Sequence, residues 1–131
     1  RQLTELKADY NQLATLPPSI GGCTSLKELD LSYNELSAIP VEAGRLSKLR
    51  CLYLNNNKLL TLPGSLGTLT LLQELNLGEN PLTGLPTELG NIRKLKTLIV
   101  DSAAVGSVPG GWRGGGDEED EDDPKAAGMG G

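Results

Sequence analysis

The sequence has no histidine and no phenylalanine, and it contains only two cysteines, three tyrosines and one tryptophan. Without histidine, the chain lacks the usual general base, the usual partner of a catalytic serine and the commonest metal ligand. Two cysteines cannot complete a zinc site by themselves. No phosphate-binding loop of the GxxxxGK[ST] type is present either. We therefore predict a non-catalytic protein that holds no metal and no cofactor.

Long apolar runs and secretory features are also missing from the sequence. No stretch of 18 or more apolar residues could cross a membrane, and no signal peptide or Asn-x-Ser/Thr sequon is present. We expect a cytoplasmic protein that does not contact a membrane. The nucleus stays open as an alternative intracellular location.

What the sequence does contain is a 23-residue repeat, LxxLxLxxNxLxxLPxxLGxL, which occurs five times. Asparagine recurs at the ninth position of the first four repeats, and proline occupies the fifteenth position of all five. A fixed period of 20 to 29 residues that begins with LxxLxLxxN is typical of a leucine-rich repeat solenoid. The repeats start at Leu3, Leu26, Leu49, Leu72 and Leu95, which are position 1 in the numbering used below.

The apolar spacing predicts the fold of each repeat. Alternation at positions 3 to 7 predicts a short strand, with side chains such as Leu29 and Leu31 pointing inward. Stacked repeats then form a parallel sheet on the concave side of an α/β solenoid. The segment Pro-x-x-Leu-Gly predicts a short helical turn on the convex side, with proline at its first position. The repeat glycines are expected at the left-handed exit of this turn; they are Gly21, Gly44, Gly67 and Gly90.

We divide the chain into a repeat array over residues 1–113 and a disordered tail over residues 114–131. The tail contains glycines and seven consecutive acids, Asp117 to Asp123, and almost nothing apolar that could offset the entropy of ordering. Trp112 is expected to cap the last repeat. Because Arg1 falls near the end of a repeat, we expect the chain to be a piece of a longer array.

The repeat asparagines are expected to be structural. A buried amide is costly unless it is hydrogen-bonded, and these side chains can bond backbone groups of their own coil and its neighbour. The predicted ladder consists of Asn11, Asn34, Asn57 and Asn80. Cys23 occupies a core slot, and Cys51 is expected to face solvent without a base to activate it.

Positions 3, 5, 7 and 8 should face solvent on the concave sheet, and they carry seven acids against one base, Lys7. Three tyrosines also fall at these positions, and exposed aromatic side chains often anchor protein interfaces. An acidic face favours a partner with a basic patch and disfavours nucleic acid. The predicted partner-binding residues are Tyr10, Glu28, Asp30, Tyr33, Cys51, Tyr53, Asn55, Glu74, Asn76 and Thr97.

The repeats resemble those of intracellular leucine-rich repeat proteins of the Ras-associated and plant Ras-group-related type. The resemblance is carried by LPPSIGGC (16–23), IPVEAGRL (39–46), LPGSLGTL (62–69) and LPTELGNI (85–92). It implies a signalling scaffold that binds a protein on its concave face, and we expect a monomer.

Two alternatives stay open. The array could be the recognition arm of a larger enzyme, such as a kinase, a cyclase or a ubiquitin ligase. Alternatively, the acidic tail could bind basic nuclear proteins.

Overall fold

A computed structural model describes residues 3–101. The predicted cap Trp112 and the acidic tail therefore lie outside the described residues, and the division of the chain at residue 113 stays a prediction.

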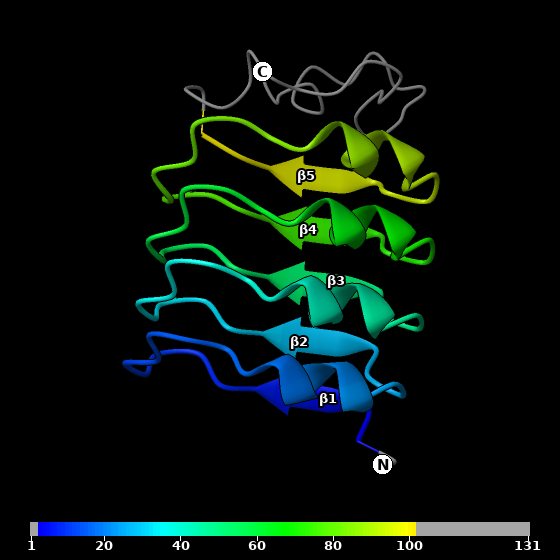
Figure 1. Ribbon diagram of the computed structural model, residues 1–131, viewed down its shortest axis with the longest axis horizontal. Helices are drawn as coiled ribbons and strands as arrows, with labels where there is room; N and C mark the ends of the chain where they lie inside the picture. Colours follow the sequence, from blue (N-terminus) through cyan, green and yellow to red (C-terminus); the bar gives the residue numbers. More distant parts are fainter. Residues whose placement is uncertain (1–2, 102–131) are drawn as a thin grey trace.

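The described residues form one parallel sheet of five short strands, stacked in chain order (Figure 1). Each strand is three residues long, and each is in register with the next, so that Leu29, Leu52 and Leu75 are aligned across neighbouring strands. The α/β solenoid predicted from the repeat is thus confirmed. The strands are β1 (Glu5–Lys7), β2 (Glu28–Asp30), β3 (Cys51–Tyr53), β4 (Glu74–Asn76) and β5 (Thr97–Ile99).

The strands cover positions 3 to 5, which is shorter than the predicted positions 3 to 7, and the backbone turns at position 8. There the φ angle is positive in all four repeats for which it is described, at 58° in Tyr10 and Tyr33, 61° in Asn56 and 56° in Glu79. The hydrogen bonds between coils nevertheless continue past the strands. The backbone N–H of Leu54, for example, donates to the carbonyl of Asn76 at 2.9 Å.

Short 3-10 helices lie opposite the sheet (Figure 1). They were expected to begin at the repeat proline, but Pro17, Pro40, Pro63 and Pro86 instead precede them as extended N-cap residues. Proline suits this position because its fixed φ is compatible with an extended backbone. It also has no backbone N–H that would need a hydrogen-bond partner before the helix. The helices are η1 (Pro18–Gly22), η2 (Val41–Arg45), η3 (Gly64–Thr68) and η4 (Thr87–Asn91).

The expectation of a left-handed glycine at the helix exit is wrong. The repeat glycines lie inside the 3-10 helices, and Gly21, Gly44 and Gly67 do not have the positive φ that a left-handed exit requires. They are needed because adjacent helices approach closely. A Cβ atom added to Gly44 would lie 2.6 Å from the backbone oxygen of Ser65 in the next coil.

We expect Gly44→Ala to lower the free energy of unfolding by about 1–3 kcal/mol, because the new methyl group must push two coils apart. Urea unfolding followed by circular dichroism measures this change. Gly22→Ala is the matched control, since a Cβ atom at Gly22 meets nothing within 4 Å. Equal stabilities of the two variants would contradict the close approach.

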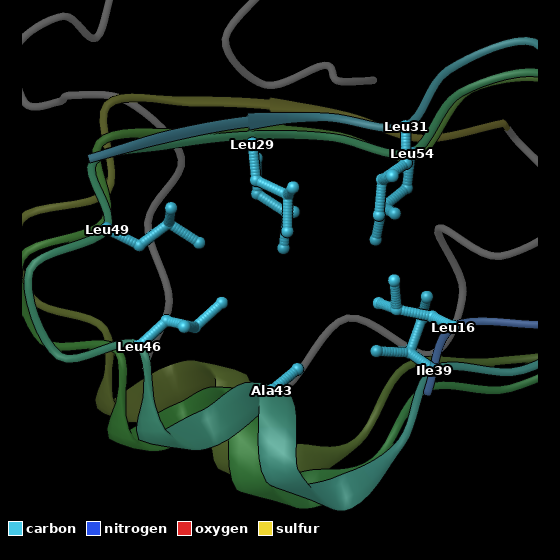
Figure 2. A pocket seen from close by; sticks show the side chains of 9 residues that line it. Leu16, Leu29, Leu31, Ile39, Ala43, Leu46, Leu49 and Leu54 are labelled. Atoms are coloured by element: carbon cyan, nitrogen blue, oxygen red, sulfur yellow. The ribbon is translucent and has the colours of Figure 1, made fainter. Parts of the chain in front are cut away.

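The core between sheet and helices consists almost entirely of leucine. Leu54, Leu49 and Leu46 are fully buried, and Figure 2 shows side chains from the strand, the helix and the loops pointing toward a common centre. A small gap remains among them, next to Ala43. Ala43 occupies position 18, where the neighbouring repeats carry larger side chains, so this gap follows from the sequence.

The repeat asparagines join the coils through hydrogen bonds. Asn57 is 7% exposed, and its Nδ2 donates to the carbonyls of Leu54 in its own coil and Leu31 in the preceding coil, at 3.0 Å each. Its Oδ1 accepts a hydrogen bond from the N–H of Leu36 in the preceding coil at 3.0 Å. Asn34 and Asn80 repeat this pattern.

Candidate protein-binding face

Two rows of side chains cover the outer surface of the sheet, and we call this surface the sheet face. The strand register places position 3 of each repeat beside position 3 of the next, and it does the same for position 5. The first row is Glu5, Glu28, Cys51, Glu74 and Thr97. The second row is Lys7, Asp30, Tyr53, Asn76 and Ile99.

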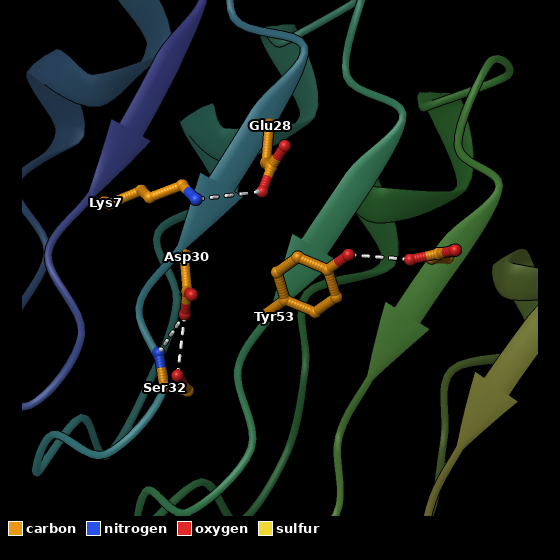
Figure 3. A network of polar contacts seen from close by, with 6 residues as sticks. Lys7, Glu28, Asp30, Ser32 and Tyr53 are labelled. Carbon is orange, nitrogen blue, oxygen red and sulfur yellow. Dashed lines mark hydrogen bonds and ion pairs between the residues drawn. The ribbon is translucent and has the colours of Figure 1, made fainter.

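The sheet face is acidic. Its two rows hold four carboxylates and one ammonium group, that of Lys7, whose Nζ lies 3.9 Å from Glu28 Oε2 (Figure 3). This is the one ion pair found within residues 3–101. The bases before the strands are exposed and belong to a different part of each coil; they are Lys27, Arg45, Lys48, Arg50, Arg93, Lys94 and Lys96. The charge is thus separated by repeat position.

Tyr53 lies at the centre of the sheet face and holds a neighbouring carboxylate. Its hydroxyl donates a 2.6 Å hydrogen bond to Glu74 Oε1, across adjacent strands (Figure 3). This bond, and then partial burial, raise the pKa of Tyr53 well above its usual value. The phenol therefore stays protonated at neutral pH and orients the carboxylate of Glu74.

Cys51 lies beside these groups in the first row and is half-buried. Burial raises the pKa of the Cys51 thiol, and the carboxylates of Glu74 and Glu28 raise it further. Since the thiolate is the reactive form, a raised pKa opposes nucleophilic chemistry at this position. Both cysteines within the described residues are free thiols.

Position 7 is less exposed than expected, since it is buried at Ser32 and Gly78 and half-buried at Asp9, Asn55 and Asp101. Ser32 is only 7% exposed, and both its N–H and its hydroxyl donate to Asp30 Oδ1, at 3.1 and 2.6 Å. Asn55 is half-buried, and its Nδ2 donates to Asn56 Oδ1 at 2.9 Å.

Tyr10 and Tyr33 form a stacked aromatic pair where β1 and β2 end. Their ring centroids are 4.3 Å apart and their planes differ by 6°. Both rings are exposed, at 70% for Tyr10 and 42% for Tyr33. The left-handed backbone at these residues costs about 1–2 kcal/mol each relative to a right-handed one. The pair is therefore held in a conformation that bulky residues normally avoid.

The pKa of the Tyr10 phenol is also raised. Desolvation is the largest cause, followed by the hydroxyl of Tyr33 and then by the carboxylates of Asp9 and Asp30. The two carboxylates thus contribute to the electrostatic environment of the Tyr10 phenol.

The structure brings most of the predicted residues together. Seven of them lie in the two rows of the sheet face: Glu28, Cys51, Glu74, Thr97, Asp30, Tyr53 and Asn76. Tyr10 and Tyr33 form a second group. Asn55 lies in the turn that follows β3. The list of partner-binding residues left out Lys7, which the sequence analysis had placed on this face, and Ile99, which is 48% exposed. The repeat position of Ile99, position 5, was the signal that could have identified it.

No group of three or more potential metal ligands occurs within residues 3–101. No helix in that part of the chain is both long enough and apolar enough to cross a membrane.

Comparison with known proteins agrees with this geometry. A family described as a leucine-rich repeat region matches residues 1–108. A leucine-rich repeat protein of Leptospira interrogans is 40% identical, with a TM-score of 0.73, over 78% of this chain and 26% of that one. A search of curated proteins found no match.

Two further structures are similar over 76% of this chain, each with a TM-score of 0.68. One is the leucine-rich repeat ectodomain of the plant membrane receptor kinase GASSHO1/SCHENGEN3 from Arabidopsis thaliana, in complex with Casparian strip integrity factor 2; it is 35% identical and 13% of it is covered. The other is an internalin from Listeria monocytogenes, which is 27% identical and 28% covered. The chain thus spans between about an eighth and about a quarter of these proteins' lengths.

The stacked coils and the open sheet face define a solenoid of the protein-interaction class, whose members use such surfaces to bind other proteins. More specifically, the chain belongs to the leucine-rich repeat family, which matches it over residues 1–108.

Proposed function

We propose that the sheet face binds a protein partner through basic side chains of that partner. The observation that carries this proposal is the one-sided charge of the two rows, four carboxylates against one ammonium group. Complementary charge across an interface steers association and selects the partner. Tyr53 adds an aromatic anchor at the centre, and its hydrogen bond fixes Glu74 in place before the partner arrives.

The finer assignment is a monomeric, intracellular signalling scaffold of the Ras-associated type. Its Ras-associated character is supported by the four proline- and glycine-containing segments quoted above.

A peptide-display selection against the full chain tests the binding proposal. We expect the selected peptides to be enriched in lysine and arginine. The double variant Glu28→Gln with Glu74→Gln should weaken their binding about tenfold, because close charge pairs across an interface can be coupled by about 1.5 kcal/mol or more. A glutamine that replaces Glu74 can still accept the hydrogen bond from Tyr53, so the fold of the sheet face is preserved.

Glu42→Gln with Glu88→Gln is the matched control. It makes the same change in net charge, and both residues lie in 3-10 helices opposite the sheet. If both double variants lost the same affinity for the peptides, net charge alone would explain the loss. That result would contradict a binding site on the sheet face. Selection of acidic or uncharged peptides would contradict the proposal as well.

A second candidate is that the array forms the recognition arm of a larger enzyme. It is favoured by the similarity to the ectodomain of a receptor kinase, of which this chain covers 13%. The full coding sequence distinguishes the two, since the second candidate requires a kinase, cyclase or ligase domain in the same protein.

A further inference from the structure

Position 8 is the most strained site of the repeat, and its occupants differ in how well they fit. Asn56 fits well, because asparagine is one of the few residues that tolerate a left-handed backbone. Tyr10 and Tyr33 adopt the same φ, 58° in each case, although bulky residues rarely do. Strain of this kind is often found at functional sites.

Burial does not compensate for this strain. The Tyr10 side chain is 70% exposed and that of Tyr33 is 42% exposed, so neither ring is part of the core. What the two rings gain in the free protein is their contact with each other, at 4.3 Å between centroids. This contact leaves a flat aromatic surface in solvent beyond the ends of β1 and β2.

Carboxylates flank this aromatic surface. Asp9 lies next to Tyr10 in the chain, and Asp30 is the last residue of β2, three positions before Tyr33. Both carboxylates contribute to the raised pKa of the Tyr10 phenol. Within residues 3–101 neither carboxylate has a salt bridge, since Lys7 is paired with Glu28. Asp30 uses Oδ1 for both of its hydrogen bonds from Ser32, which leaves Oδ2 free of the bonds found there.

An exposed aromatic face next to unpaired carboxylates suits one type of side chain in particular. A guanidinium group is planar, stacks on aromatic rings and donates paired hydrogen bonds to a carboxylate. A lysine ammonium group is a compact and strongly hydrated charge that does not stack. An aromatic face beside carboxylates therefore favours arginine over lysine.

We propose that the stacked pair of Tyr10 and Tyr33, with Asp9 and Asp30 beside it, binds an arginine side chain of the partner. This rests on the proposed function and adds to it a second contact, separate from Glu28, Tyr53 and Glu74. A partner segment would place one arginine on the aromatic pair and further basic groups on the two rows.

The test is an NMR titration of the full chain, labelled with ¹³C in its three tyrosine rings, using two synthetic peptides as probes. One peptide is acetyl-Gly-Arg-Gly-Arg-Gly-amide, and the other has lysine in place of arginine. We expect the arginine peptide to shift the resonances of Tyr10 and Tyr33 and to bind at least about threefold more tightly than the lysine peptide. Absent shifts, or equal affinities for the two peptides, would overturn the proposal.

The double variant Tyr10→Asn with Tyr33→Asn separates binding from folding. Asn56 shows that asparagine fits this backbone, so we expect the melting temperature to be unchanged or higher, while affinity for the arginine peptide falls about threefold to tenfold. Tyr10→Phe with Tyr33→Phe keeps the rings and should keep the affinity. A loss of stability with full affinity would assign the tyrosines to the fold and overturn the proposal.

The two proposals fail in different ways. If the Asn variant binds the arginine peptide as the wild type does, while Glu28→Gln with Glu74→Gln binds it more weakly, the aromatic site is wrong and the proposed function stands. If only the Asn variant loses affinity, the aromatic site stands and the role of the two rows is wrong.

Discussion

Replacing Asn57 by alanine is expected to lower the free energy of unfolding by about 2–4 kcal/mol, measured by urea denaturation. The amide makes hydrogen bonds to two coils, and its loss leaves the buried N–H of Leu36 without its acceptor. The carbonyls of Leu31 and Leu54 each retain a second asparagine donor, Asn34 and Asn80 respectively. The expected loss of stability therefore comes from the unpaired N–H of Leu36 and from the weakened link between the coils.

Asn11→Ala is the control for this prediction. Asn11 occupies the same repeat position, but it is exposed, and its Nδ2 donates only to Ala8 and Asp9 in its own coil. We expect a loss below about 1 kcal/mol, which is typical of one exposed hydrogen bond. Similar losses at Asn11 and Asn57 would show that the links between coils do not determine stability.

Replacing Leu54 by alanine is expected to lower the free energy of unfolding by an amount in the upper part of the range of about 2–5 kcal/mol. Leu54 is fully buried and lines the small gap beside Ala43 (Figure 2). The new cavity would merge with this gap, and sites that cannot collapse around a cavity lose the most stability. Thermal unfolding followed by circular dichroism would show the loss as a large fall in melting temperature.

Leu60→Ala makes the same chemical change in the same repeat. The Leu60 side chain is 54% exposed, so its removal should change stability by less than about 1 kcal/mol. A comparable fall in melting temperature for Leu54→Ala and Leu60→Ala would contradict the inward placement of Leu54.

The convex side shows where prediction from sequence failed. Proline and glycine were assigned to the two ends of a helical turn from their general preferences, which describe one helix in isolation. In the structure, Pro40 precedes the helix and Gly44 lies within it. The requirement for glycine comes from Ser65 in the next coil, a contact between residues 21 positions apart that no local preference describes.

The candidate site was predicted in part for a similar reason. The period of two along a strand assigned Glu28, Asp30 and Tyr53 to the outer surface, and the structure places them there. The same period assigned Ser32 to that surface, yet Ser32 is buried. The alternation ends where the backbone turns. The left-handed residue of this turn, at position 8, cannot be recognised from the sequence, because tyrosine, asparagine and glutamate all occur there.

The sequence by itself determined the stacking of the coils, their register and the composition of the core. A 23-residue period with leucine at fixed positions can bury those leucines only when each coil covers the next. The tertiary structure alone decided the contacts made across coils: the hydrogen bond from Tyr53 to Glu74, the stacking of Tyr10 on Tyr33 and the close approach at Gly44. Such contacts depend on side-chain directions and backbone angles, and the repeat pattern specifies neither.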